Sequence, residues 1–297
     1  MSGALRTLRF IARHPLNRRS PLRAVGRFVA WQVATRLQPG AFVVPFVDGT
    51  RLVVARGMTG ATGNVYCGLH EFEDMAFVLH ALRAEDLFVD VGANVGSYTV
   101  LASGAVGAHC ISFEPAPRAY RGLLDNLRLN DLMTRVEARN ECLAAAPGEA
   151  EFTADFDTGN HVVAEPESGV GTVRVTVTTL DIALANRDPA ILKMDVEGYE
   201  TAVIDGADRT LRSPSLRAVL MELNGSGARY GCDDRSLHER ILRYGFTPAT
   251  YDPARRELRR REWHGSSEGN VLYVRDLESL RSRLAGAPQR DLHGTLV

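Results

Sequence analysis

Acidic residues and glycines in one stretch of the chain have the types and spacing of a nucleoside-binding site. Asp90 precedes a turn with the pattern DxGxNxG, which contains Gly92, Asn94 and Gly96. Glycine lets a turn bend sharply and lets a ligand approach the main chain, and the start of the following helix offers unpaired N–H groups. Glu114 follows Asp90 by 24 residues. Glu114 would thus stand at the end of the strand that follows the one before the turn, where an acid can accept hydrogen bonds from both ribose hydroxyls.

The charge of Asp90 bears on which nucleoside would bind. The turn differs from the GxGxxG pattern of dinucleotide-binding proteins, and a carboxylate just before it would repel a pyrophosphate. It suits a cationic ligand such as S-adenosylmethionine (SAM), which carries an amino group and a sulfonium. Two alternatives stay open: an NAD(P)-dependent oxidoreductase, which shares the ribose acid, and a protein that binds SAM or a nucleotide without catalysis.

A second group of charged residues could carry the reaction. Asp195 and Glu197 follow a predicted strand, and Lys193, the only lysine in the chain, lies within it on the same face as Asp195. Methyl transfer from a sulfonium needs an aligned acceptor and a group that takes its proton. We expect Asp195 to be this base and Glu197 to orient the substrate or cofactor. Lys193 would neutralise the acids or stabilise the forming alkoxide. Capping of the next helix is an alternative role for the two acids.

The same strand ends also offer oxygen ligands for a metal. Asp195, Glu222 and Asn224 are donors of the kind that Mg²⁺ takes. Because a third clear carboxylate is missing from this set, we expect the protein to act without Mg²⁺.

Two histidines and a loop are further candidates near the acceptor. His161 ends a polar insertion, Asp157-Thr158-Gly159-Asn160-His161, and His70 follows a glycine-rich segment over residues 57–64. Either histidine could be a base, although surface or capping roles are more common for such residues. We predict that 57–64 is a loop that could, with Glu71 as a cofactor-binding residue, close over the cofactor as a lid; a rigid turn without ligand contact is the alternative.

The elements that must position these residues alternate along the chain. Short apolar runs between helical patterns predict an α/β protein with a parallel sheet covered on both faces. Residues 147–171 are rich in turn formers. The predicted strands cover 41–47, 51–55, 87–91, 109–113, 135–138, 173–177, 191–195, 218–223, 246–251 and 270–274, and the predicted helices cover 22–37, 71–82 and 117–130, a segment from 199, and 236–244.

Four segments in this order resemble the FkbM-type SAM-dependent methyltransferases: VDVGANVGSYT, SFEP, LLDNLRLND and LKMDVEGYE. The resemblance covers residues 65–275. It implies a Rossmann-like class I methyltransferase fold, with a seven-stranded, mostly parallel sheet whose last strand is antiparallel. It further implies O-methylation of a hydroxyl on a small molecule, such as a sugar or a lipid- or polyketide-like acceptor. In this resemblance Asp90, Gly92, Asn94 and Gly96 match the SAM-binding turn, and Glu114 matches the ribose-binding acid.

Charge is distributed unevenly along the chain. Residues 1–47 contain eight arginines and no acid, and 22–37 has the spacing of an amphipathic basic helix. We expect this helix to pack on the acidic body or to contact an anionic membrane weakly, and we expect no nucleic-acid partner. The predicted organisation is a basic extension over 1–40, a strand, loop and helix cap over 41–85, the SAM-binding domain over 86–276 and a tail over 277–297.

Composition is that of an ordinary globular protein, with 45% hydrophobic and 24% charged residues. Its four cysteines are far apart, which suits a reducing compartment, and no stretch has the length of a membrane helix or the pattern of a secretory signal. These observations predict a cytoplasmic location.

Overall fold

A computed structural model describes residues 3–18, 20–154, 156, 159–165, 169–263, 265, 269–292 and 295–297. Asp157 and Thr158 of the polar insertion, Arg19 and the side chain of Arg6 lie outside this description. No helix in the described part of the chain is both long enough and apolar enough to cross a membrane.

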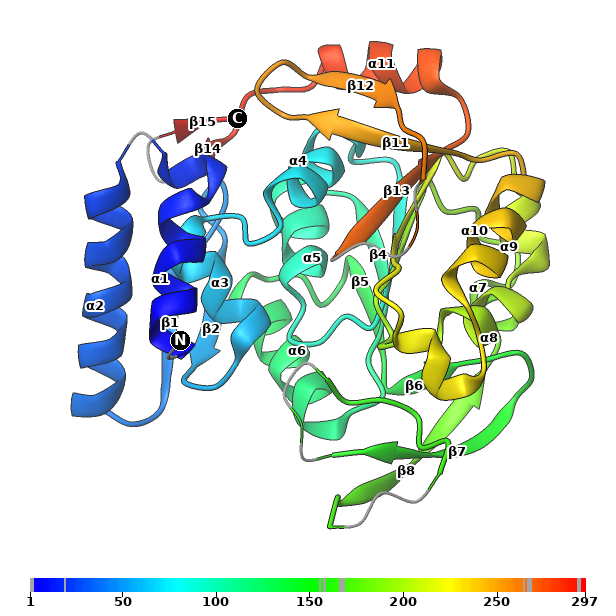
Figure 1. The fold of residues 1–297 in the computed structure, drawn as a ribbon, viewed down its shortest axis with the longest axis horizontal. Coiled ribbons are helices and arrows are strands. Elements are labelled where there is room, and N and C mark those ends of the chain that lie inside the picture. The colour runs from blue at the N-terminus through cyan, green and yellow to red at the C-terminus, as the bar shows by residue number, and fades with distance from the viewer. Residues whose placement is uncertain are drawn as a thin grey trace.

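An eight-stranded sheet forms the centre of the molecule (Figure 1). Five neighbouring strands, which reach from the centre of the sheet to one edge, run parallel to one another. The strand of this sheet that comes last in the chain is antiparallel to both of its neighbours. This arrangement confirms the predicted Rossmann-like class I fold. In spatial order the strands are β12 (Glu257–Arg260), β11 (Thr247–Asp252), β13 (Asn270–Val274), β10 (Ala218–Glu222), β9 (Ile191–Met194), β3 (Leu87–Val91), β4 (His109–Phe113) and β5 (Val136–Arg139).

The sheet differs from the prediction at two places. An eighth strand, β12, is added at the edge beside β11, and its sequence ELRR lacks the apolar alternation that predicts a strand. The predicted strand over 173–177 is present as β8 (Thr172–Thr178), but it belongs to a separate three-stranded sheet with β6 (Glu141–Leu143) and β7 (Gly148–Thr153). β7 lies in the segment predicted to be turns, and its pairing with β8 makes it a strand.

Helices cover both faces of the central sheet and enclose two apolar cores. On β3, Phe88 packs in one core, whereas Val89 and Val91 pack in the other. The first core contains residues from α4 (Phe72–Ala81), α5 (Ser97–Val100) with its π-helical continuation η2 (Leu101–Val106), and α6 (Pro117–Leu129); the second contains residues from α7 (Leu180–Leu184), α8 (Glu200–Asp205), α9 (Asp208–Arg212) and α10 (Asp234–Arg243).

The N-terminal segment packs beside the first core (Figure 1). It consists of α1 (Gly3–Arg13), a short 3-10 turn η1 (Pro15–Asn17), α2 (Pro21–Leu37), the hairpin β1 (Ala41–Pro45) and β2 (Arg51–Ala55), and α3 (Thr59–Cys67). Arg27 of α2 donates to the carbonyl of Tyr66 at 2.8 Å, which ties α2 to α3. The loop predicted over 57–64 is therefore wrong from Thr59 onward, because tertiary packing makes a helix of a glycine-rich segment.

Residues 277–297 fold back onto the body. Helix α11 (Leu277–Ala285) packs against α4 and β12, and Arg283 donates to the carbonyl of Ala81 and pairs with Asp86. A hairpin of β14 (Asp291–Leu292) and β15 (Thr295–Leu296) follows, and Arg290 beside it pairs with Asp48 at 2.6 Å.

Candidate active site

A cavity of about 960 Å³ opens beyond the carboxyl ends of the central strands. Its volume is near the upper end of the ~300–1,000 Å³ range of ligand sites, and this position is where open α/β sheets bind ligands. Most of the candidate residues from the sequence lie in its wall, namely Glu71, Gly92, Asn94, Glu114, Lys193, Asp195, Glu197, Glu222 and His70. The cavity therefore brings these residues together from five separate segments of the chain.

Gly92 allows the end of β9 to approach the turn after β3. Its φ is +75°, and a Cβ there would lie 1.9 Å from the carbonyl oxygen of Asp195. Any side chain at this position would push the strand end away and strain the backbone. Gly96, in contrast, does not line the cavity; a Cβ at Gly96 would meet the side chain of Leu123 on α6. Gly92 shapes the site, and Gly96 permits helix packing.

Every backbone amide of the turn over residues 92–96 donates to another group of the protein. The amides of Gly92 and Ala93 both donate to the carbonyl of Phe113, and that of Gly96 donates to Ala93. The remaining two amides, of Asn94 and Val95, donate to the side chains of Glu114 and Asn94 respectively. Residues 92–96 therefore offer a ligand no free backbone donor within the turn itself.

Glu114 is held in place by this turn. Its two carboxylate oxygens accept from the amides of Asn94 and Ala116, each at 2.8 Å. Each oxygen keeps a second lone pair, so the carboxylate can still accept two hydroxyl donors. Burial raises the pKa of Glu114 to about 7, while the two amides favour its ionised form. The apolar side chains of Phe113, Cys142 and Leu143 lie in the same wall.

Lys193 and Asp90 form a buried ion pair behind this wall. They are neighbours on the paired strands β9 and β3, and Lys193 Nζ lies 3.9 Å from Asp90 Oδ1. Asp90 is fully buried, accepts from Thr99 Oγ1 at 2.7 Å, and does not line the cavity. From its place before the turn, Asp90 was predicted to contact a cationic ligand directly. Its position means that Asp90 would act on such a ligand through Lys193.

Lys193 connects Asp90 to the cavity. Its Nζ lies 3.3 Å from Asp195 Oδ2 and 5.0 Å from the centre of the Tyr98 ring. Burial by itself would lower the pKa of Lys193, but the charges of Asp195 and Asp90 outweigh it and raise that pKa. Lys193 therefore stays an ammonium and provides a fixed positive charge beside the site.

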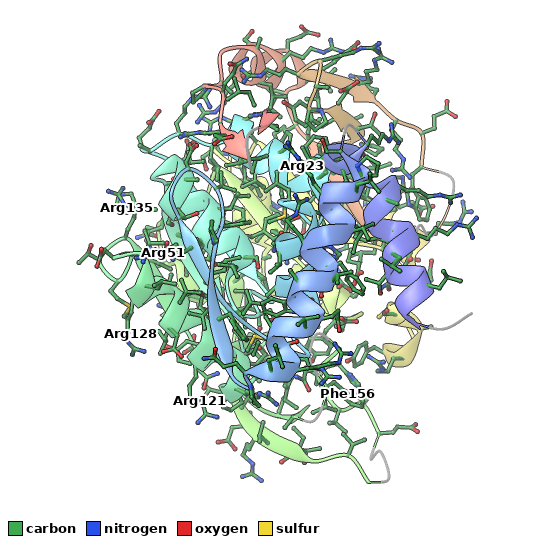
Figure 2. All side chains as sticks on the ribbon, turned by 90° about the vertical axis from the view of Figure 1, so that its left-hand side faces the viewer. Arg23, Arg51, Arg121, Arg128, Arg135 and Phe156 are labelled. Atoms are coloured by element: carbon green, nitrogen blue, oxygen red, sulfur yellow. The ribbon has the colours of Figure 1, made fainter. Side chains whose placement is uncertain are left out.

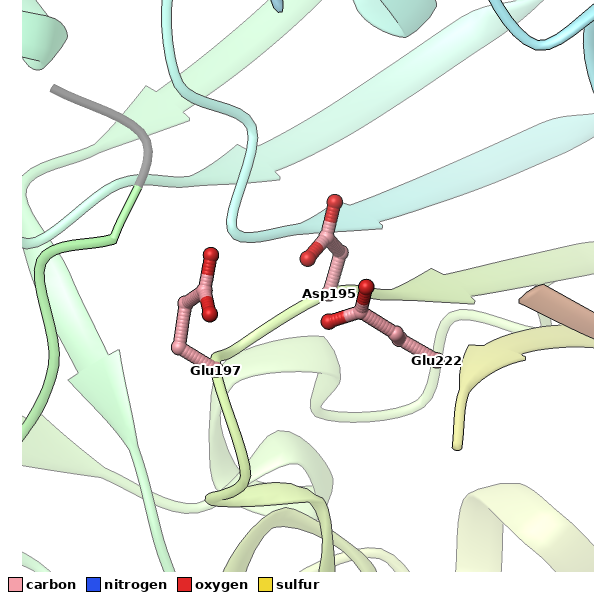
Figure 3. Close-up of side chains that lie close together, drawn as sticks. All are labelled: Asp195, Glu197 and Glu222. Carbon is pink, nitrogen blue, oxygen red and sulfur yellow. The ribbon is translucent and has the colours of Figure 1, made fainter. Parts of the chain in front are cut away.

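Three carboxylates converge at the end of β9 and β10. Figure 3 shows the side chains of Asp195, Glu197 and Glu222 directed into one space. Oxygen atoms from the three lie within 4.8 Å of one another, so the set could hold a metal ion. The third member of the set is the carboxylate of Glu197, in place of the Asn224 side chain that the sequence suggested as the third oxygen ligand. The Asn224 Oδ1 atom instead accepts from the amide and hydroxyl of Ser226.

Burial and the closeness of the three carboxylates raise the pKa of two of them. Burial, followed by the charges of Asp195 and Glu197, raises the pKa of Glu222 to about 8. Burial and the charge of Asp195 also raise the pKa of Glu197. Among the described residues, no cation lies within ion-pair distance of Glu222. Glu222 is thus a carboxylate suited to taking up a proton near neutral pH, a role that its sequence position alone did not indicate.

Glu71 is held in the cavity wall by two hydrogen-bond donors. Tyr98 donates its hydroxyl to Glu71 at 2.7 Å, and the amide of Asn270 donates to both Glu71 and Asp74 at 3.1 Å. Burial and the charge of Glu71 raise the pKa of Asp74 to about 8. Glu71 adds negative charge to the cavity and precedes α4, whereas the predicted lid over 57–64 is largely α3, which forms part of the wall.

The two candidate histidines have different surroundings. His70 lines the cavity and packs on Gly63, where a Cβ would lie 2.1 Å from its ring, and burial lowers its pKa. His161 is absent from the wall; its Nδ1 lies 2.8 Å from the carbonyl of Gly159, and its ring stacks on Phe156. His161 therefore supports its own loop and does not line the cavity, which disfavours it as a base, although its neighbours Asn160 and Val162 lie in the wall.

One part of the cavity wall is aromatic, and the sequence did not predict it. Phe10 of α1, Phe28 and Trp31 of α2, and Tyr66 of α3 line it. Phe28 and Tyr66 pack edge to face with ring centres 5.3 Å apart. The only sequence signal was that Phe28 and Trp31 fall on one side of the amphipathic helix. The N-terminal helices therefore build part of the site.

Comparison with known proteins agrees with the resemblance. The sequence model of the Methyltransferase FkbM domain matches residues 90–248, which is more than half of the chain. Methyltransferase sdnD of Sordaria araneosa is 27% identical over 171 residues, which cover 46% of this chain and 66% of sdnD. The chain thus spans just under two thirds of this relative.

Similar solved structures include a methyltransferase FkbM of Methylobacillus flagellatus and a TehB-like SAM-dependent methyltransferase of Corynebacterium glutamicum. The first is 17% identical with a TM-score of 0.44, covering 65% of this chain and 44% of that protein. The second is 11% identical with a TM-score of 0.41, and the match covers 73% of this chain and 95% of that protein. Since the FkbM domain model spans the turn, Glu114 and the acidic cluster and covers more than half of the chain, the chain belongs to the FkbM methyltransferase family.

Proposed function

We propose that this protein is a SAM-dependent methyltransferase that methylates a hydroxyl of a small molecule. The observation that carries the proposal is a single cavity that joins Glu114 and its turn to the cluster of Asp195, Glu197 and Glu222. One end suits a nucleoside, and the other holds carboxylates that can take a proton. The volume of about 960 Å³ is sufficient for a cofactor together with an acceptor.

The wall around Glu114 fits the adenosine part of SAM. The free lone pairs of Glu114 would accept from the two ribose hydroxyls, and Phe113, Cys142 and Leu143 would border the flat purine. The negative charge of Asp195, Glu71 and their neighbours would favour the cationic end. When bound, SAM supplies an electrophilic methyl group that a hydroxyl oxygen can attack.

We assign the general base to Glu222, in place of the Asp195 favoured by the sequence. Asp195 is occupied by Lys193 at 3.3 Å, whereas Glu222 has a pKa of about 8. A base is most effective when its pKa is near the operating pH. Glu222 would remove the proton of the acceptor hydroxyl as the oxygen attacks, Asp195 and Glu197 would orient the acceptor, and the Lys193 ammonium would stabilise the developing negative charge.

The aromatic wall favours an acceptor with an apolar body. Phe10, Phe28, Trp31 and Tyr66 offer large apolar surfaces and few hydrogen-bond partners. A lipid- or polyketide-like alcohol fits this wall better than a free sugar. Incubation of the protein with labelled SAM and separate pools of lipid alcohols and sugars tests the choice: label in the lipid-alcohol pool supports it, and label confined to the sugars contradicts it.

Glu114→Ala is expected to raise the Kd for SAM by at least about tenfold, because a charged carboxylate that accepts two hydroxyl hydrogen bonds is lost. Isothermal titration with SAM and with S-adenosylhomocysteine measures the change. Glu137→Ala is the matched control, since Glu137 lies on the next strand, β5, away from the cavity. Equal affinities for the two variants, or tight binding of NAD⁺ by the unmodified protein, would contradict this cofactor site.

Turnover is expected to be unchanged by EDTA. Lys193 already provides a fixed positive charge 3.3 Å from Asp195, so the acidic cluster does not need Mg²⁺ to stabilise the alkoxide. Initial rates of methyl transfer with and without EDTA check this. A loss of rate that added Mg²⁺ restores would instead assign Asp195, Glu197 and Glu222 to a metal.

A further inference from the structure

The outer face of α2 is apolar although it faces solvent. Leu22 and Leu37 are 85% and 81% exposed, and Val29 and Val33 are 51% and 50% exposed. Together with Gly26, these residues recur at the spacing of one helix face over the whole length of α2. Soluble proteins rarely leave so long an apolar stripe uncovered, and such stripes mark surfaces that bind a partner.

Arginines border this stripe and leave it without negative charge. With 3.6 residues per turn, Arg23 and Arg36 lie on opposite edges of the exposed face. Neither pairs with an acid among the described residues, and residues 1–47 contain no acid. Arg27, in contrast, points inward and bonds Asn17 and Tyr66. An apolar stripe between arginines is complementary to an anionic surface with an apolar interior.

The helix is supported on its other side. Ala24, Trp31 and Thr35 are buried against the body. α2 lies on the outside of the molecule, at the left in Figure 1 and facing the viewer in Figure 2, where Arg23 is labelled. A flat surface could therefore approach the stripe without rearrangement of the fold.

We propose that the outer face of α2 docks on an anionic lipid membrane. The apolar stripe of Leu22, Val29, Val33 and Leu37 would enter the boundary between headgroups and acyl chains, and Arg23 and Arg36 would contact lipid phosphates. A second copy of the chain is a poorer occupant. A two-fold α2–α2 contact would bring the same surface together, with arginine against arginine and no acid to pair with them.

Docking in this orientation has a consequence for the cavity. Phe28 and Trp31, on the opposite side of the same helix, line its aromatic part. A membrane-bound helix α2 would therefore place that part of the cavity near the lipid. The docking itself does not depend on the methyltransferase function, because its test measures binding alone.

Co-sedimentation of the full chain with vesicles tests the proposal. Vesicles of phosphatidylglycerol and phosphatidylcholine in equal parts are compared with vesicles of phosphatidylcholine alone. We expect binding to the anionic vesicles that weakens as salt is added. Arg23→Gln with Arg36→Gln should weaken binding by about fivefold for each arginine, and Val29→Gln with Val33→Gln should weaken it as well. Thermal unfolding establishes that each variant is folded.

Matched controls lie on the far side of the molecule. Ile182→Gln with Leu242→Gln removes exposed apolar side chains from α7 and α10, and Arg243→Gln removes an exposed arginine from α10. These variants should bind vesicles like the unmodified protein, and equal losses in them would overturn the proposal.

Other outcomes would also overturn it. One is that the unmodified protein does not bind anionic vesicles. If it is then a dimer that Val29→Gln with Val33→Gln dissociates, the stripe would instead bind a second copy of the chain. Another is binding that neither pair of α2 variants weakens. A third is retention on single-stranded RNA, but not on vesicles, that is lost in the arginine variant alone, since this would indicate a nucleic-acid surface.

Discussion

Glu222→Gln is expected to lower kcat by about 10²–10⁴-fold and to leave the Kd for SAM unchanged. Glutamine keeps the size of the side chain but cannot take the proton of the acceptor hydroxyl. Glu222 lines the cavity beside Asp195 and Glu197, and burial with those two charges raises its pKa to about 8. Steady-state rates with an identified acceptor, together with isothermal titration of SAM, separate the chemical step from cofactor binding.

The pH dependence of the rate tests the assignment of Glu222 as the base. Since the proton-free carboxylate is the active form, kcat/KM of the unmodified protein should rise with pH through about 8 and then level off. In Glu222→Gln this rise should be absent. Glu197→Gln, which removes another carboxylate of the same cluster, should reduce the rate less and keep the rise. If Glu197→Gln rather than Glu222→Gln loses the rise, the assignment of the base is wrong.

Lys193→Met is expected to lower the free energy of unfolding by about 3–5 kcal/mol, because it leaves the buried carboxylate of Asp90 without a cation. The side chains of Lys193 and Asp90 are 4% and 1% exposed, so water cannot replace the lost charge. Asp195, at 34% exposure, is better able to be hydrated. Urea denaturation of the two proteins measures the difference.

The double variant Lys193→Met with Asp90→Asn separates charge from packing. Asparagine removes the stranded carboxylate, so much of the stability lost in Lys193→Met should return. A Lys193→Met protein as stable as the unmodified one would show that the pair carries little of the fold's stability. If the double variant is as unstable as Lys193→Met, the packing of the lysine methylene groups, and not the lysine charge, accounts for the lost stability.

Several features were readable from the sequence because they depend on neighbouring residues. Apolar runs at 87–91 and 270–274 match β3 and β13, since a buried strand needs only a short stretch of apolar side chains. The spacing of Gly92 and Glu114 placed both in the cavity wall, because each directly follows such a strand. The family resemblance rested on the same local segments and led to the correct fold.

Elements that depend on tertiary pairing were not readable. β7 and β12 are polar, and their strand partners make them strands. α3 is glycine-rich and is helical because it packs against α2 and β2. Local propensity argues against all three, and pairing or packing outweighs it.

The chemistry of the site was only partly determined by the sequence. Residue types and order indicated a lysine within the strand over 191–195 and a group of carboxylates at and after its end. The register of β3 against β9 decided that Asp90 pairs with Lys193 behind the wall, and the ends of β9 and β10 decided that Glu222 meets Asp195 and Glu197. The packing of α1 and α2 supplied the aromatic wall. Burial and the distances between charges set proton affinity and pocket shape, and both arise only when distant segments come together.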